Sequence, residues 1–249
     1  MDDIIYSLGW DVGGWMGKNN SFVLIKAVNN SIDKWFYLEN NFQIKENNLF
    51  ELEEVIYELT DDYYKKEMNL VVGIDAPLTF PKDFITFLKN EKEYIKKPKL
   101  EIYNNLAYRD TDRYIYEKYN KKPLSASFDR LGNNATVAMS HLRYWSKEYD
   151  INQEIRFKKD KINVIETYPA LVKPGKYKKA FSKIDKIIPD GIKHGTDTYD
   201  AALCALMAIQ FGYRNRFKGL PTLVYPPKNN SIYEKEGWIY HFDLDQIKQ

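Results

Sequence analysis

The chain has 249 residues, of which 44% are hydrophobic and 29% are charged, and its formal net charge is only +2. This length fits one large domain or a domain with an insertion, and the balanced charge gives no strong sign of nucleic-acid binding. The single cysteine, Cys204, excludes an intramolecular disulfide and a cysteine-cluster metal site. No apolar run reaches membrane length, and Asp2 and Asp3 follow Met1 where a secretory signal would need basic and apolar residues. We therefore expect one cytoplasmic domain over residues 1–249, with no membrane segment.

The charges are distributed unevenly along the chain. Residues 1–75 hold six basic and 14 acidic side chains, whereas residues 76–249 hold 31 basic and 21 acidic ones. This polarity could set a basic groove beside an acidic metal site, or it could form two ordinary solvated faces. Charge alone leaves both interpretations open.

Three β-strands are predicted at the start of the chain, over residues 4–11, 21–28 and 34–38. Each is rich in β-branched and aromatic residues, and the short links between them favour an antiparallel meander. A helix follows, because apolar residues recur at helical spacing and Asn47 or Asn48 can cap it. Its apolar positions are Leu49, Leu52, Val55, Ile56, Leu59 and Tyr63.

The stretch VVGIDAPLTFP at residues 71–81 predicts a fourth, buried strand that ends in a carboxylate. Asp75 stands where this strand must stop, because Pro77 cannot continue a ladder. A carboxylate at such a position costs free energy unless it is paired, hydrogen-bonded or bound to a cation. Asp75 could also simply cap the turn that follows. The pattern recurs at Asp11 and near Glu166, each at the end of another apolar run, and this favours a common purpose.

Residues 82–160 are predicted to form a mostly helical insertion after the fourth strand. Helical segments are expected at about 82–95, 109–119 and 134–149, and they are rich in aromatic residues and lysine. Basic residues interleave with tyrosines there, a mixture that suits phosphate contacts and base stacking but also fits a solvated face with half-buried tyrosines. These basic residues are Lys96, Lys97, Lys99, Arg109, Arg113, Lys121, Lys122 and Arg130.

The last third of the chain begins with a fifth predicted strand at residues 162–166. A stretch with six lysines follows at 173–186, and its structure is not predicted. Two apolar segments close the chain, at 220–226 and 237–242. We expect them to form a hairpin or an edge of the sheet.

A helix that begins with acidic residues is expected from Thr196. Asp197 and Asp200 are three residues apart, so both lie on one helical face. His194 precedes them and could shuttle a proton, although a histidine in a Lys-His-Gly loop is more often a surface residue. Alanines along the helix allow close packing on a sheet: Ala201, Ala202, Ala205 and Ala208.

Acidic residues at strand ends, together with a helix that begins Asp-x-x-Asp-Ala, resemble the RNase H-like superfamily. The start of the last helix resembles that of Holliday-junction resolvases. More narrowly, the chain resembles an uncharacterised family of predicted RNase H-like nucleases. The matching pieces are GIDAPL at 73–78, YRDTD at 108–112, ETYPA at 166–170, YDAALCALMA at 199–208 and EGWI at 236–239.

This resemblance and the order of the periodic segments lead to one expectation for the fold. We expect an α/β, RNase H-like domain with a five-stranded mixed sheet flanked by helices. The first three strands should be antiparallel, and a helical insertion at about 82–160 should follow the fourth strand. Asp11 and Asp75 should then lie side by side at the ends of central strands, with the last helix closing over them.

The resemblance also implies a metal-dependent nuclease that hydrolyses the phosphodiester bonds of DNA or RNA. Two Mg²⁺ or Mn²⁺ ions held by carboxylates can supply such chemistry. The expected metal ligands and catalytic residues are Asp11, Asp75, Glu166 and Asp200, with Asp197 as a further catalytic candidate. The expected substrate contacts are Arg109, Asp112 and Arg130.

Two other functions fit parts of the sequence. Asp11, Gly13 and Gly14 look like the phosphate loop of ATP-dependent phosphotransferases of the actin and sugar-kinase type, although no second glycine-rich motif for adenosine follows. The two glycines could also serve only as a turn between strands. A non-catalytic nucleic-acid-binding module is the third interpretation, because a fold does not establish an activity. The sequence leaves open the type of nucleic acid and the oligomeric state.

Overall fold

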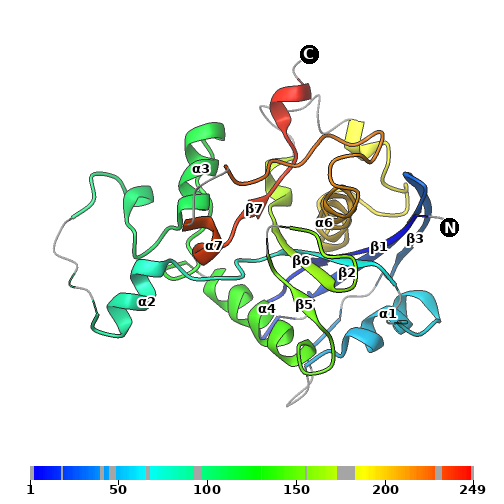
Figure 1. Ribbon diagram of the computed structural model, residues 1–249, viewed down its shortest axis with the longest axis horizontal. Helices are drawn as coiled ribbons and strands as arrows, with labels where there is room; N and C mark the ends of the chain where they lie inside the picture. Colours follow the sequence, from blue (N-terminus) through cyan, green and yellow to red (C-terminus); the bar gives the residue numbers. More distant parts are fainter. Residues whose placement is uncertain are drawn as a thin grey trace.

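A mixed β-sheet with helices on both faces forms the centre of the computed structural model (Figure 1). The structure describes residues 3–17, 19–39, 42–44, 49–65, 68–91, 93, 97–129, 131–154, 156–172, 183–227 and 232–247. Some predicted features lie outside these residues, namely the Asn47 or Asn48 cap, Lys96, Arg130 and most of the 173–186 stretch.

The sheet has seven strands in the order β3-β2-β1-β4-β6-β5, and β7 also pairs with β6. The predicted antiparallel arrangement of the first three strands is confirmed, and β4 and β6 then run parallel to β1. The strands are β1 (Ile4–Asp11), β2 (Ser21–Val28), β3 (Ser31–Tyr37), β4 (Leu70–Asp75), β5 (Ile151–Asn152), β6 (Ile162–Thr167) and β7 (Ile239–Tyr240). The central strands are apolar on both sides because both faces of the sheet are covered.

The prediction of five strands is wrong, because the sheet also includes β5, which was not predicted, and β7, which lies in the closing segment 237–242. Each has only two residues and pairs in parallel with β6, so neither shows a periodic pattern. Of the two closing segments, 237–242 contributes the edge strand β7, and it meets the other through an antiparallel bridge from Leu223 to Phe242. The strand β3 begins earlier than predicted, since Asn29 and Asn30 both have positive φ and form a tight hairpin turn.

Two apolar cores lie on opposite faces of the sheet. One packs beneath α6 (Asp197–Gly212), which is almost completely buried, and includes Ile5 and Val71. The other packs beneath α1 (Leu52–Thr60) and α4 (Leu131–Trp145), and includes Leu8. Since side chains alternate along a strand, this division fixes which face every other strand residue occupies.

Helices are the main regular elements of the segment between β4 and β6, although less than half of its described residues are helical. It contains α2 (Lys82–Leu88), the short 3₁₀ helix η1 (Glu101–Tyr103), α3 (Asp110–Tyr119) and α4, and it ends with β5. The remaining short elements are η2 (Pro169–Leu171), α7 (Ile232–Glu236) and η3 (Leu244–Ile247). Among the described residues, no helix has the length and apolar character needed to cross a membrane.

Candidate metal centre

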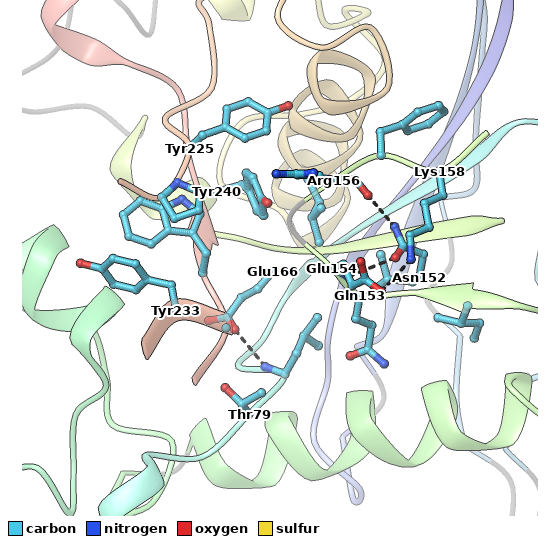
Figure 2. A pocket seen from close by; sticks show the side chains of 18 of the residues that line it. Thr79, Asn152, Gln153, Glu154, Arg156, Lys158, Glu166, Tyr225, Tyr233 and Tyr240 are labelled. Carbon is cyan, nitrogen blue, oxygen red and sulfur yellow. Dashed lines mark hydrogen bonds and ion pairs between the residues drawn. The ribbon is translucent and has the colours of Figure 1, made fainter. Parts of the chain in front are cut away.

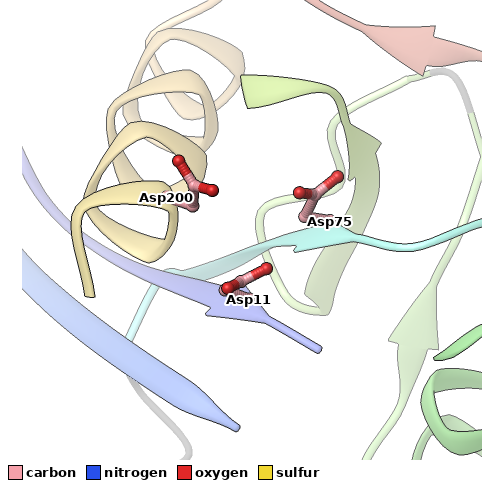
Figure 3. A group of neighbouring side chains, drawn as sticks. All are labelled: Asp11, Asp75 and Asp200. Carbon is pink, nitrogen blue, oxygen red and sulfur yellow. The ribbon is translucent and has the colours of Figure 1, made fainter. Parts of the chain in front are cut away.

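Three aspartates converge where two neighbouring parallel strands end. Asp11 and Asp75 are direct partners in the β1–β4 register, so they share one edge and one face of the sheet. Asp200, in the first turns of α6, points toward both (Figure 3). One carboxylate oxygen from each lies within 4.8 Å of the other two, and all three residues are half-buried.

A pair of glycines sets the distance between α6 and these strands. Gly9 and Gly73 are partners in the same register, two residues before the aspartates and on the same face. A Cβ atom on Gly9 would lie 1.9 Å from the carbonyl oxygen of Ala201, and one on Gly73 would lie 2.5 Å from that of Cys204. Only glycine permits so close an approach of the helix backbone. The repeated Gly-x-Asp pattern therefore lets Asp200 reach the two strand ends.

The chemistry of the three side chains fits a hard divalent cation. They offer only carboxylate oxygens, and Mg²⁺ or Ca²⁺ binds oxygen at about 2.0–2.6 Å, which puts opposite ligands roughly 4–5 Å apart. Three like charges held together also repel one another unless a cation is present. Burial, with Asp75, Asp11 and Asp200, raises the pKa of the Cys204 thiol well above its usual value. Cys204 is thus a buried, protonated packing residue.

Asp197, the further catalytic candidate from the sequence, does not belong to this group of three. It occupies the first position of α6, where a negative charge is favourable beside the helix N-terminus. The start of α6 is tied down by Ser21, whose hydroxyl donates to Thr198 Oγ1 at 3.1 Å. Ser21 is the strand partner of Asp11, so this contact links the helix start to the aspartate site.

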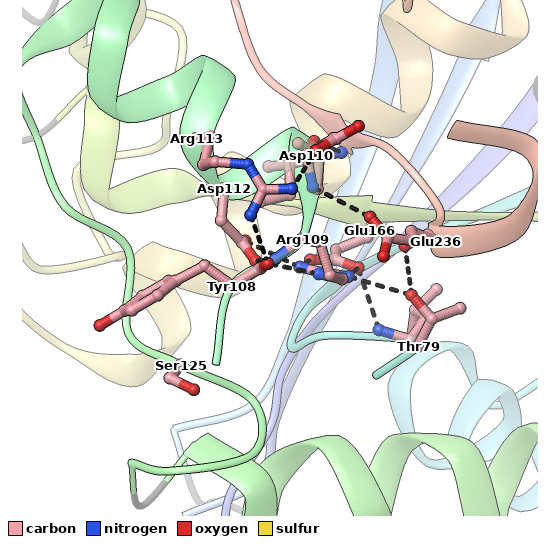
Figure 4. Close-up of polar contacts among 12 residues, drawn as sticks. Thr79, Tyr108, Arg109, Asp110, Asp112, Arg113, Ser125, Glu166 and Glu236 are labelled. Atoms are coloured by element: carbon pink, nitrogen blue, oxygen red, sulfur yellow. Dashed lines mark hydrogen bonds and ion pairs between the residues drawn. The ribbon is translucent and has the colours of Figure 1, made fainter. Parts of the chain in front are cut away.

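Glu166 lies on the other face of the sheet from the three aspartates. Its partner in the β4–β6 register is Ile74, not Asp75, and alternation therefore turns its side chain away from α6. Glu166 instead accepts hydrogen bonds from two nitrogens of Arg109, at 2.7 and 2.6 Å, and from the Leu78 amide at 3.0 Å (Figure 4). The predicted fourth metal ligand is thus engaged in a separate network.

Arg109 is the centre of this network and has only 1% of its surface exposed. Besides Glu166, its guanidinium donates to Asp112 at 3.1 Å. Burial alone would lower the pKa of Arg109, but Asp112 and Glu166 outweigh that effect and raise it. The guanidinium therefore has no exposed surface for a substrate phosphate, in contrast to the contact expected from sequence.

Glu236 extends the network and was missed as a structural residue. One of its carboxylate oxygens accepts from the Lys82 amide at 2.8 Å, and the other accepts from the Asp110 amide at 3.0 Å. These amides open α2 and α3, so one carboxylate satisfies the N-termini of two helices. Thr79 also donates to the Glu236 carbonyl oxygen. No local pattern in the sequence signals this role, because the three partners are remote in the chain.

The loop after Asp11 is occupied by asparagine side chains. The Gly13 amide donates to Asn20 Oδ1 at 3.0 Å, and the Trp15 amide donates to Asn133 Oδ1 at 3.2 Å. A Cβ atom on Gly14 would lie 2.1 Å from Asn133 Nδ2. These glycines therefore make room for protein side chains, and amides that a phosphate loop would offer are already used.

Comparison with known proteins adds no family to this geometry. No protein-family model, no curated protein and no solved structure matches the chain. The fold is α/β with a mixed sheet, and any functional conclusion depends on the three aspartates and their surroundings.

Proposed function

We propose that the chain is a divalent-metal-dependent nuclease with an RNase H-like arrangement of its acidic site. The observation that carries this proposal is the convergence of Asp11, Asp75 and Asp200 from three separate elements. The glycine pair beneath α6 supports this proposal. Without side chains at Gly9 and Gly73, α6 can lie close enough to the strands to bring the three carboxylates together. Nucleic acid is the corresponding substrate class.

In this proposal the three aspartates hold Mg²⁺ or Mn²⁺. Such ions make a bound water nucleophilic and stabilise the charge on the leaving oxygen of a phosphodiester. Asp11 and Asp75 are fixed by the strand ladder, and Asp200 is fixed by a buried helix. Rigid placement of this kind lowers the cost of arranging the reacting groups.

Glu166, Arg109 and Asp112 act in this proposal as positioning residues. Glu166 holds the Leu78 amide, three residues after Asp75, so the network fixes the chain that leaves the site. Arg109 neutralises Glu166 and Asp112 where burial would otherwise be costly. They would support catalysis without contacting the metal or the substrate.

The phosphotransferase alternative is less well supported. Its phosphate loop would need free backbone amides near Gly13, and asparagine side chains occupy two of these amides. A non-catalytic module is less well supported, because it assigns no role to the convergence of three like charges.

The test is cleavage of a panel of single-stranded, duplex and junction DNA and RNA with Mg²⁺ or Mn²⁺. Asp75→Asn and Asp200→Asn should each lower cleavage by about 100-fold or more, since even residues behind metal ligands cost 10–100-fold. Asp197→Asn makes the same chemical change on α6 outside the group and should keep most activity. Retained cleavage in Asp75→Asn, or no metal-dependent cleavage by the wild type, would contradict the proposal.

A further inference from the structure

A pocket of about 1600 Å³ lies along the outer edge of β6 (Figure 2). It occupies the gap between the two short edge strands, because β5 pairs only with the start of β6 and β7 only with its end. Among the described strands, none pairs with Val164 or Ile165 on this edge, and both line the pocket. Small-molecule pockets usually measure about 300–1000 Å³. This volume therefore suits a segment of a polymer better than one small ligand.

The pocket carries more positive charge than its own carboxylates neutralise. Lys158 pairs with Glu154 at 2.6 Å, and the other lining lysine pairs with an aspartate outside the pocket. The lining carboxylate Glu166 is neutralised by the buried network described above. Arg156 and Arg214 remain, both exposed, and the described part of the chain shows no ion pair for either. Two guanidinium groups are thus available to an anion.

The backbone of Arg214 indicates that its side chain serves a purpose. Arg214 follows the C-terminus of α6 with φ of 52°, and its amide and that of Asn215 donate to the Phe211 and Gln210 carbonyl oxygens. This is the Schellman arrangement, in which glycine is the usual residue because a side chain is unfavourable in the left-handed region. An arginine kept in a costly conformation is a reason to look for a function.

Aromatic side chains form the wall beside these arginines. The Phe157 ring lies under the Arg214 guanidinium, 5.4 Å from ring centre to Cζ. Tyr225 stacks on Phe211 of α6 with an interplanar angle of 14°, and Tyr240 meets Tyr225 edge-on. Tyr225 and Tyr240 both line the pocket (Figure 2). Positively charged side chains therefore lie beside aromatic rings that are held in place by packing.

We propose that this pocket binds a single-stranded segment of nucleic acid. Arg156 and Arg214 would hold its phosphates, and the wall that includes Phe157 and Tyr225 would contact its bases. Single strands expose their bases for contact with aromatic rings, whereas a duplex hides them. The inference rests on the proposed function for its substrate class, and its test is independent of catalysis.

The experiment measures binding of a fluorescent single-stranded 12-mer by anisotropy in chelator, where no metal-dependent cleavage occurs. Arg214→Gly should weaken binding about tenfold. It should also reduce the slope of log affinity against log salt by about 0.7, the value for one lost phosphate contact on a single strand. Its melting temperature should equal or exceed that of the wild type, because glycine suits the helix end. Arg156→Ala, a change of an exposed side chain, should have a similar effect on binding.

Two controls separate this result from general effects. Asn120→Gly relieves the same left-handed conformation at the end of α3, outside the pocket, and should leave binding unchanged. Arg143→Ala removes one exposed positive charge from α4, also outside the pocket, and should leave the salt slope unchanged.

Several outcomes would overturn the inference. If Arg214→Gly and Arg156→Ala both bind the 12-mer with wild-type affinity, these arginines do not bind phosphate. If an abasic 12-mer binds as well as the normal one, the aromatic wall does not contact the bases. Equal competition by a duplex or by poly-glutamate would show that the pocket recognises charge alone. If cleavage occurs but these variants bind normally, only this inference fails; if binding depends on the pocket but nothing is cleaved, only the proposed function fails.

Discussion

Asp75 is the last residue of β4 and Glu166 is the last but one of the neighbouring parallel strand β6, yet they belong to two different regions of the molecule. Asp75 faces α6 and joins two other aspartates, whereas Glu166 faces the opposite side and is bound by Arg109. A single residue of register separates them, because Ile74, not Asp75, is the partner of Glu166. A carboxylate near a strand end thus acquires its role from the face of the sheet that it occupies, and this face alternates with every residue.

The two regions also differ in how charge is balanced. The network around Arg109 contains its own cation and is almost completely buried. The aspartate site is half-buried and gathers three negative charges. On our account, the first region stabilises the fold, and the second trades stability for metal binding.

The largest loss of stability is expected from Arg109→Ala. Removing one partner of a buried ion pair leaves uncompensated charge and typically costs about 3–5 kcal/mol. The free energy of unfolding should fall by that amount in urea denaturation. Lys122→Ala is the matched control, since it breaks an exposed pair with Glu101 and should cost no more than about 1 kcal/mol. An Arg109→Ala variant of normal stability that binds oligonucleotide weakly would restore its predicted substrate role.

Amide substitutions at the two strand ends should have opposite effects. Glu166→Gln weakens charge-assisted hydrogen bonds to Arg109 and should lower stability by about 1.5–3 kcal/mol. Asp75→Asn relieves repulsion and, in chelator, should leave stability equal or raise it by up to about 1 kcal/mol. Thermal and urea unfolding of both variants side by side would measure the difference. Equal losses in the two variants would mean that Asp75 is structural.

Gly9→Ala should damage the aspartate site without touching an aspartate. The added methyl group would meet the α6 backbone, and overpacking of this kind costs about 1–3 kcal/mol. Displacing Asp200 by about 1 Å should lower Mn²⁺-dependent cleavage by about 100-fold. In Gly212→Ala, at the far end of the same helix, the nearest atoms belong to the side chains of Ile5 and Val71. Gly212→Ala should therefore lower stability less and keep activity. If both variants lose activity equally, Gly9 does not act by positioning Asp200.

The smallest effect is expected at Tyr168, whose phenol is influenced by a carboxylate of each region. Burial, then Asp75, then Asp112 raise the pKa of this phenol to about 12. A negative neighbour disfavours the phenolate, so removing the charge in Asp75→Asn should lower the pKa. The pKa of Tyr168 is expected to fall by less than about 1, which is equivalent to less than about 1.4 kcal/mol. An ultraviolet titration compared with Tyr168→Phe measures it, and an unchanged pKa would show that Asp75 is already neutralised.

Local patterns in the sequence predicted much of the fold. The ranges 4–11 and 21–28 are strands as predicted, because their apolar and β-branched residues are continuous. The acidic residue at the end of β1 and the one at the end of β4 were recognised for the same reason. The repeated Gly-x-Asp pattern was not recognised, because its meaning depends on α6 packing across both strands.

The features that were not predicted from the sequence depend on contacts between distant segments of the chain. Glu166 was taken for a metal ligand because its strand end resembles the other two, and only the register shows which face it occupies. The pairing of Arg109 with Glu166 joins residues 57 apart in the chain. Glu236 contacts amides more than 100 residues away. No local periodicity carries such information.

The most direct test of the central claim is the location of Mn²⁺ in crystals soaked with the ion, found by anomalous scattering. The account predicts one or two peaks among Asp11, Asp75 and Asp200, absent in Asp75→Asn crystals soaked identically. No peak is expected at Glu166, because Arg109 already neutralises it. Absence of Mn²⁺ from the three aspartates at concentrations that saturate known metal-dependent nucleases, or a peak coordinated by Glu166, would contradict the account.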